Sequence, residues 1–236
     1  MPNFLIEEDF GWPYKSIAGV DEAGRGPWAG PVVSAAVVLN KKNIPSDLDD
    51  SKKLSEKRRQ SLYSSIYNSH FVGVGISSIE EIDNLNILQA TFLSMKRALN
   101  NLDCSVDVIL VDGNLNPGFD HHTECIVKGD SISLSIAAAS IIAKVTRDNL
   151  MSKIDEEFPN YNWKKNKGYG TSFTRDGGRN KDGTRNRDAQ KKKIPVKEFG
   201  VRHNIWKIVN SYGVGQKNKK AYEHPALMPM QLANDL

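Results

Sequence analysis

The chain has 236 residues, 39% of them hydrophobic and 25% charged, a composition typical of a globular protein with one sizeable core. No run approaches the roughly 18 apolar residues of a membrane helix, the acidic N-terminus lacks the basic start of a signal peptide, and two cysteines are too few for a disulfide framework or a cysteine zinc site, so we expect a cytoplasmic protein. The formal net charge of +4 is distributed unevenly, because the basic residues concentrate late in the chain.

Hydrophobic periodicity predicts an α/β protein built on a mixed sheet. Two apolar runs, at residues 17–22 and 31–39, indicate the strands of a hairpin with a long, glycine-rich connection. The pattern then predicts, in chain order, a helix at 54–68, a strand at 71–77, a helix at 84–102, strands at 106–111 and 124–127, and a long helix at 131–158. This last helix is apolar almost all round in its middle, so we expect it to lie buried against the sheet.

Beyond residue 158 the hydrophobic pattern weakens into a segment rich in basic residues, Gly and Asn. Residues 164–193 contain eleven Lys or Arg against three Asp, a net charge of +8. A block of this kind is most often a solvated surface, but contacts with a phosphate backbone need the same residues. Residues 202–212 regain helical spacing, and the residues after them are expected to form a tail.

The most informative stretch follows the first predicted strand and contains Asp21-Glu22-Ala-Gly24-Arg25-Gly26. Glycines let backbone N–H groups approach a ligand closely, so two acids, a cation and a glycine-rich loop together suggest metal-assisted chemistry on a phosphate. Neighbouring residues of a regular strand point to opposite faces. Asp21 and Glu22 could therefore face one site only if the strand breaks, and the two glycines would permit such a break.

Four carboxylates stand where apolar segments begin or end: Asp21, Glu22, Asp112 and Asp130. Taken singly, each has a structural explanation, since Asp130 could cap a helix and Asp112 could start a turn. Taken together, they indicate a metal site at the carboxyl ends of strands, where open α/β sheets bind ligands. Hard divalent cations prefer such oxygen ligands. Two ions, roughly 3.5–4 Å apart, would activate a water and stabilise the leaving oxygen of a displacement at phosphorus.

The sequence offers no rival site. Its five histidines lack metal-ligand spacing, and His121-His122 are expected to be solvated in a polar loop. A Gly-x-Ser-x-Gly elbow and a P-loop are both absent. The Gly24-Arg25-Gly26 stretch is not a Gly-x-Gly-x-x-Gly motif in a βαβ unit, so dinucleotide binding is not expected.

The chain resembles bacterial ribonuclease HII, the type 2 ribonuclease H, in blocks that keep this family's order over residues 17–171. The first long block, at 18–33, holds the stretch just described. A second, Lys128-Gly-Asp130, leads into the apolar helix at 136–148. The shorter blocks are Asp50-Ser-Lys-Lys-Leu-Ser55, Val111-Asp-Gly113 and Lys167-Gly-Tyr-Gly-Thr171.

This resemblance implies an RNase H-like fold, with a mixed five-stranded sheet flanked by helices and a small C-terminal helical portion. It implies an endoribonuclease that hydrolyses RNA in RNA–DNA hybrids and cuts 5′ of ribonucleotides embedded in duplex DNA. The products would carry 5′-phosphate and 3′-hydroxyl ends. The implied roles are ribonucleotide removal from DNA and RNA primer removal.

By the same resemblance, Asp21, Glu22, Asp112 and Asp130 match the family's catalytic, metal-binding acids. They would hold Mg²⁺ or Mn²⁺, with two ions in the site during catalysis. The chemistry agrees with the pattern of acids seen in the sequence.

The resemblance also implies residues that bind the substrate. Gly24-Arg25-Gly26 matches the loop that senses the ribose 2′-hydroxyl, the one group that distinguishes RNA from DNA locally. Tyr169 matches the tyrosine that packs on the sugar beside the RNA–DNA junction. Lys52 and Lys53 either contact phosphate or simply lie on the approach to a helix. Lys144 and Arg147 could pair with acids and are left unassigned.

After Thr171 the sequence departs from the family. We expect a catalytic domain at 1–171, a basic Gly/Asn-rich insertion at 172–200, and a C-terminal helix with a tail at 201–236. The family's histidine-containing helix has its counterpart around His203, displaced by this insertion. The insertion is expected to add electrostatic contacts with a nucleic-acid duplex.

Two other functions compete with the ribonuclease. The first is a catalytically silent nucleic-acid-binding module of the same fold, against which all four acids argue. The second is another nuclease of that fold, such as a resolvase or a DNA exonuclease, which would have no 2′-hydroxyl to sense. The expected partners are RNA–DNA hybrids and DNA duplexes that contain ribonucleotides. Binding to a membrane is not expected, and the sequence does not indicate a replication clamp as a partner. We expect the chain to be a monomer.

Overall fold

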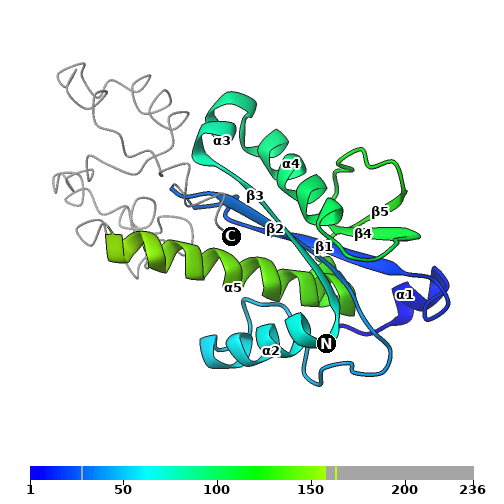
Figure 1. Cartoon of the computed structure of the whole chain (residues 1–236). Coiled ribbons are helices and arrows are strands. Elements are labelled where there is room, and N and C mark those ends of the chain that lie inside the picture. Colours follow the sequence, from blue (N-terminus) through cyan, green and yellow to red (C-terminus); the bar gives the residue numbers. More distant parts are fainter. Residues whose placement is uncertain (28, 158–162, 164–236) are drawn as a thin grey trace, which may run out of the picture.

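A five-stranded mixed sheet, in the order β3-β2-β1-β4-β5, forms the centre of the protein (Figure 1). The computed structural model describes residues 1–27, 29–157 and 163. The strands are β1 (Ile17–Ala23), β2 (Val32–Val38), β3 (Phe71–Ser77), β4 (Val108–Asp112) and β5 (His122–Ile126). β1, β2 and β3 run antiparallel in succession, whereas β4 is parallel to both β1 and β5. The predicted mixed sheet and its five strands are confirmed.

Helices cover both faces of this sheet (Figure 1). On one face, α5 (Leu134–Glu157) packs against β1 and β2, and α2 (Glu56–Ser69) packs against α5. On the other face, α4 (Ile87–Asn100) packs against β3 and β2, with α3 (Ile79–Leu85) before it. Two short helices complete the described part, α1 (Leu5–Asp9) and the 3-10 helix η1 (Gly129–Ser131).

The long apolar helix lies buried against the sheet, as expected. Its residues Ala138, Ile141 and Ile142 are fully buried and join one hydrophobic cluster with Ala35 and Val37 of β2. The backbones of the helix and the sheet meet directly at Gly19 of β1. A Cβ atom there would stand 2.1 Å from the carbonyl carbon of Ser135, a distance that no side chain tolerates. The missing side chain at Gly19 therefore sets how closely α5 approaches β1.

The predicted helix at 84–102 proves to be the end of α3 followed by α4, so its predicted start was wrong. Asn86, at φ +71°, separates the two helices, and its side chain accepts hydrogen bonds from the first backbone N–H groups of α4. The start of α3 is a capping box, in which Ser78 and Glu81 each bind the other's backbone N–H. This signature is visible in the sequence.

The N-terminal segment contacts and stabilises the start of α5. Asn3 forms a parallel bridge with Ser133, and the buried Glu7 accepts hydrogen bonds from Ser133 Oγ at 2.7 Å and from the backbone N–H of Ser135 at 2.9 Å. A carboxylate at a helix N-terminus satisfies free N–H groups and complements the helix dipole. The sequence pattern did not indicate this role for α1.

Several expectations concern residues outside the described part of the chain. They are the basic insertion at 172–200, the C-terminal helix and tail at 201–236, and Tyr169. Among the residues that are described, no helix is both long enough and apolar enough to cross a membrane.

Candidate active site

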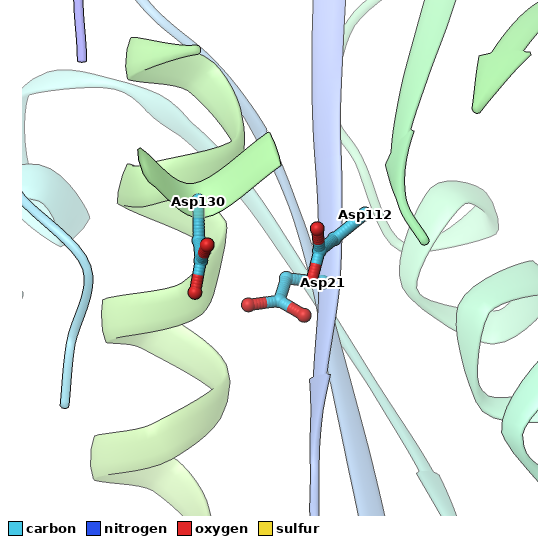
Figure 2. A group of neighbouring side chains, drawn as sticks. All are labelled: Asp21, Asp112 and Asp130. Carbon is cyan, nitrogen blue, oxygen red and sulfur yellow. The ribbon is translucent and has the colours of Figure 1, made fainter. Parts of the chain in front are cut away.

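Three aspartates from separate segments meet at one edge of the sheet (Figure 2). Val20 of β1 pairs with Val111 of β4, so the residues that follow them, Asp21 and Asp112, lie at neighbouring parallel strand positions. Asp130 lies in η1, between β5 and α5. One carboxylate oxygen from each of these three aspartates lies within 4.8 Å of the others. The structure thus brings together three of the four acids that the sequence singled out.

Backbone hydrogen bonds orient two of these carboxylates. The N–H of Gly129 donates to Oδ1 of Asp112 over 2.7 Å, which joins the end of β4 to the segment that carries Asp130. The N–H of Glu22 donates to Oδ1 of Asp21 over 2.7 Å. Asp21 and Asp130 are both only 4% exposed. Figure 2 shows the three carboxylates next to one another, with Asp21 between Asp130 and Asp112.

Burial and mutual repulsion make this group electrostatically unfavourable without a cation. Burial, followed by the charges of Glu22 and Asp112, raises the pKa of Asp21 well above its usual value. Burial, followed by the charge of Asp130, raises the pKa of Asp112. Buried carboxylates that ionise so reluctantly are a common mark of functional sites. Their oxygens are the ligands that Mg²⁺ and Mn²⁺ accept.

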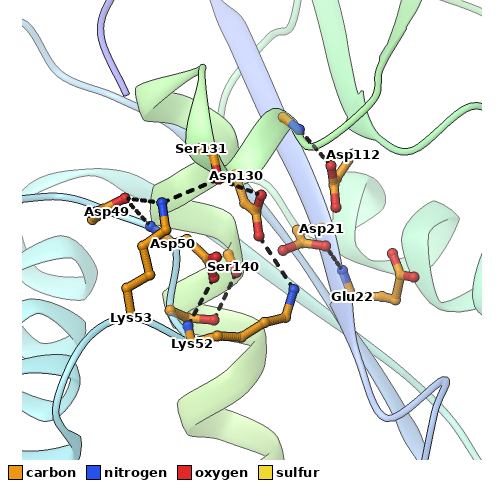
Figure 3. Close-up of polar contacts among 12 residues, drawn as sticks. Asp21, Glu22, Asp49, Asp50, Lys52, Lys53, Asp112, Asp130, Ser131 and Ser140 are labelled. Carbon is orange, nitrogen blue, oxygen red and sulfur yellow. Dashed lines mark hydrogen bonds and ion pairs between the residues drawn. The ribbon is translucent and has the colours of Figure 1, made fainter. Parts of the chain in front are cut away.

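Glu22 lies beside this group rather than within it. β1 continues regularly through Ala23, paired with β2, so the break that would turn both acids to one side does not occur at Glu22. In Figure 3 the carboxylate of Asp21 extends toward Asp130, and that of Glu22 extends away from it. Oε1 of Glu22 lies 3.6 Å from Nη1 of Arg25. Burial raises the pKa of Glu22, Arg25 opposes this, and the charge of Asp112 adds to it, so Glu22 still senses the site.

Lys52 brings a positive charge to the acids from the loop before α2 (Figure 3). Its Nζ lies 3.4 Å from Oδ2 of Asp130, while 76% of the side chain stays exposed. Burial disfavours the charged ammonium group, but the carboxylates of Asp130 and Asp21 outweigh this and raise the pKa of Lys52. The side chain of Lys53 contacts Oδ1 of Asp49 at 3.2 Å and Oγ of Ser131 at 3.5 Å. Both lysines therefore stand at the rim of the acidic site and precede the helix, whose N-cap is Ser55.

Two buried serines, which no motif in the sequence marks, connect this loop with the acids. Oγ of Ser51 lies 2.9 Å from Oγ of Ser140 on α5, and Ser140 also hydrogen-bonds Asp21, which lowers the pKa of that carboxyl. The available signal was a polar residue at position 140 inside the apolar stretch 136–143 of the helix. Of the two unassigned cations on α5, Lys144 pairs with Asp148 at 2.7 Å, whereas Arg147 donates hydrogen bonds to the backbone carbonyl groups of Pro31 and Ala29.

Known proteins share this arrangement of sequence and fold. The sequence model of the family described as Ribonuclease HII matches residues 18–193. A ribonuclease HII of Wolbachia pipientis subsp. Culex pipiens is 58% identical over 171 residues, which cover 72% of this chain and 85% of the relative. The crystal structure of ribonuclease H2 from Pyrococcus horikoshii OT3 is 30% identical with a TM-score of 0.56, and the match covers 66% of this chain and 81% of that one.

A second solved structure, the PCNA:RNase HII complex from Archaeoglobus fulgidus, is 27% identical with a TM-score of 0.53, over 66% of this chain and 82% of that one. These likenesses confirm the RNase H-like fold that the sequence blocks implied. The acids lie at the edge where β1 and β4 end, within the part that the family model matches. The chain therefore belongs to the ribonuclease HII family and is a ribonuclease H endonuclease that acts on RNA–DNA hybrids.

Proposed function

We propose that Asp21, Asp112 and Asp130, with Glu22 beside them, hold the Mg²⁺ or Mn²⁺ ions of the reaction, two of them during catalysis. The donor set supports this proposal, because three carboxylate oxygens lie within 4.8 Å of one another and burial raises the pKa of two of the carboxyls, Asp21 and Asp112. Such ions, when bound, would lower the pKa of a coordinated water and stabilise negative charge on the leaving oxygen. The close approach of the three carboxylates is the single observation that carries the proposal.

The acids would bind the metal ions, and the lysines would bind the phosphates of the substrate. Carboxylates and phosphate are both negatively charged and repel each other. The three aspartates would therefore bind the reacting phosphate only indirectly, through cations that lie between them. Lys52 is mostly exposed and lies 3.4 Å from Asp130, which supports a role in which its ammonium group leaves this carboxylate and binds a phosphate of the substrate. Lys53 stands at the same rim. Both lysines are therefore proposed to contact the nucleic-acid backbone rather than only to precede α2.

Recognition of the ribose would fall to Gly24-Arg25-Gly26, which directly follows β1 and the acid pair. A backbone without side chains can approach the 2′-hydroxyl closely, and this group is what distinguishes RNA from DNA locally. Tyr169, which lies outside the described residues, is proposed to pack on the sugar beside the junction. Water would attack the phosphorus on the 5′ side of the ribonucleotide. Cleavage of the P–O3′ bond would leave a 5′-phosphate and a 3′-hydroxyl.

The test is a DNA duplex with a single ribonucleotide, incubated with Mg²⁺ or Mn²⁺. The unmodified protein should cut immediately 5′ of the ribonucleotide, and the Asp21→Asn and Asp130→Asn variants should lose at least about 100-fold in rate, because each removes one metal-binding charge. Asp83→Asn is the matched control, since Asp83 is exposed on α3. Equal cleavage by all four proteins would contradict the proposed metal site.

The same substrate distinguishes the competing functions. A silent binding module would retain the duplex without cutting it, and a resolvase or DNA exonuclease would also cut the duplex that lacks the ribonucleotide. We further propose roles in ribonucleotide removal from DNA and in RNA primer removal, which follow from cleavage at such sites. A monomeric state remains a prediction. We also propose a clamp partner, which the sequence does not indicate but which the PCNA complex of the Archaeoglobus relative supports.

A further inference from the structure

A buried arginine lies under the loop that connects β1 and β2. Arg147, in the middle of α5, is only 1% exposed. Its Nε donates to the carbonyl oxygen of Pro31 over 3.0 Å, and its Nη2 donates to that of Ala29 over 2.8 Å. A buried guanidinium group is tolerated only when hydrogen bonds replace its hydration. The end of the loop supplies these acceptors.

The start of the loop rests on the same side chain. Gly24 has φ +103°, a conformation that favours glycine, and a Cβ atom there would stand 2.4 Å from Nε of Arg147 and 2.4 Å from the carbonyl oxygen of Pro31. At Gly30 a Cβ atom would stand 3.1 Å from Nη2 of Arg147. Both ends of the loop therefore contact one guanidinium group, and neither end has space for a side chain on that side.

The planar guanidinium group suits this task. Its N–H groups point in fixed directions, so the carbonyl groups of Ala29 and Pro31 are held at a set separation. A lysine in the same place would present one nitrogen with rotatable N–H bonds and would hold the two carbonyl groups less strictly. Because Arg147 is buried, it contacts the loop and not a nucleic acid.

We propose that Arg147 is a positioning residue for ribonucleotide recognition: it holds the loop between β1 and β2 from inside the protein, so that the backbone of Gly24-Arg25-Gly26 keeps its place next to Asp21 and Glu22. This proposal rests on the function proposed above, in which that backbone reads the 2′-hydroxyl group. Displacing a recognition loop by about 1 Å is enough to lower a rate by a factor on the order of 100. A change at Arg147 should therefore reduce the preference for a ribonucleotide without removing any group that touches the substrate.

The first measurement is a ratio of kcat/KM values for two duplexes, one with a single ribonucleotide and one with its 2′-fluoro analogue, which cannot donate a hydrogen bond. In Arg147→Lys this ratio should fall at least about fivefold, and in Arg147→Met at least about tenfold, since the loop would lose its fixed position. Ile66→Val, a core change on α2, controls for reduced stability and should leave the ratio unchanged. A wild-type ratio in folded Arg147→Lys would overturn the proposal.

The second measurement is hydrogen exchange of the substrate-free protein, which does not depend on the proposed function. The backbone N–H groups of residues 24–26 should exchange at least about tenfold faster in Arg147→Lys, while those of β4 and α4 keep their rates, because only the loop loses support. If Arg147→Lys does not fold, Arg147→Met is judged by the same two measurements. Unchanged exchange at residues 24–26, or equal acceleration along the whole chain in both variants, would overturn the positioning role. Should the unmodified protein itself show no preference for the ribonucleotide, the proposed function fails, and exchange alone still decides the role of Arg147.

Discussion

The hydroxyl oxygens of Ser51 and Ser140 lie 2.9 Å apart, and this buried pair joins the loop of Lys52 and Lys53 to the helix behind the acids. Ser140 also hydrogen-bonds Asp21, so a continuous chain of hydroxyl groups runs from the cationic rim to the deepest carboxylate. Such buried networks constrain the groups that they connect. The position of Lys52 and the orientation of Asp21 are therefore coupled.

Removing this network should weaken metal binding. In Ser140→Ala, Asp21 loses a hydrogen bond that lowers its pKa, so protons should compete better with the metal. We expect the Mg²⁺ concentration for half-maximal cleavage to rise about 3- to 10-fold, which lies within the roughly 0.5–1.5 kcal/mol of a typical hydrogen bond. A Mg²⁺ titration of cleavage at pH 7 measures this. Ser64→Ala, on the exposed side of α2, is the control; an unchanged titration in Ser140→Ala would contradict the expectation.

Asp21→Asn should make the metal-free protein more stable. Because the pKa of Asp21 is raised in the folded state, its ionisation opposes folding, and its contribution to stability falls as the pH rises from about 3.8 toward the raised value. The variant should gain at least about 1 kcal/mol at pH 7, since one pKa unit corresponds to about 1.4 kcal/mol. Urea unfolding in EDTA at pH 5 and pH 7.5 checks both the gain and its dependence on pH. Equal stability of the two proteins at both pH values would refute this account.

The ion pair between Glu81 and Arg97 should stabilise the protein only above mildly acidic pH. Two hydrogen bonds, at 2.6 and 2.8 Å, join the carboxylate to the guanidinium group, and they lower the pKa of Glu81. The contribution is present above pH about 4.5 and is lost as the pH falls through the lowered value. Because both side chains are partly exposed, we expect Glu81→Gln to lose about 0.5–1 kcal/mol at pH 7. Thermal unfolding between pH 3 and 7 tests this, with exposed Glu80→Gln in the same helix turn as the control.

Lys52→Ala should weaken the binding of a duplex and reduce its dependence on salt. If Lys52 contacts one phosphate, the slope of log K against log salt concentration should decrease in magnitude by about 0.9. Binding titrations with a catalytically inactive background, Asp130→Asn, measure the slope without cleavage. Lys96→Ala, exposed on α4 at the opposite face of the sheet, should leave the slope unchanged. A slope that stays constant in Lys52→Ala would assign this lysine a purely structural role.

The basic segment offers a test on a larger scale. Deleting residues 174–193 removes eight Lys or Arg and three Asp. The deletion should raise the dissociation constant for a duplex and flatten its salt dependence, because fewer counterions are released on binding. A salt titration of the deleted protein beside the full chain is sufficient. An identical slope in both would show that the segment does not contact the duplex.

The sheet and the acids could be predicted because β1, β2 and β4 are mostly apolar runs and three of the acids stand where such runs or the following helix begin or end. The helix α1 could not be predicted, since its five residues of mixed polarity carry no periodic signal. The helix predicted at 84–102 leaves out most of α3, although Ser78 and Glu81 form a capping signature in the sequence. Boundaries of this kind depend on one residue, here Asn86, whose positive φ the periodicity does not reveal.

The acids of the candidate site could be predicted from the sequence, but the residues that position them and the neighbouring loop could not. Asp21, Asp112 and Asp130 could be grouped because strand order places their segments at one edge of the sheet. Ser140 and Arg147 act through contacts with residues far away in the sequence, and although both are polar residues on a mainly buried helix, a single sequence does not show which residues they contact. The direction of Glu22 also required the structure, since it depends on how far β1 stays regular beyond Asp21.

The direct contact between β1 and α5 at Gly19 has a consequence for how this enzyme can change over evolution. Asp21 lies two residues beyond Gly19, and Asp130 lies five residues before Ser135, the residue that Gly19 touches. The distance between these two acids is therefore set by the contact between backbone atoms of β1 and α5 rather than by the volumes of core side chains. Substitutions among the core residues Ile141, Ile142 and Val37 can then alter stability while the distance between the two proposed metal ligands is conserved.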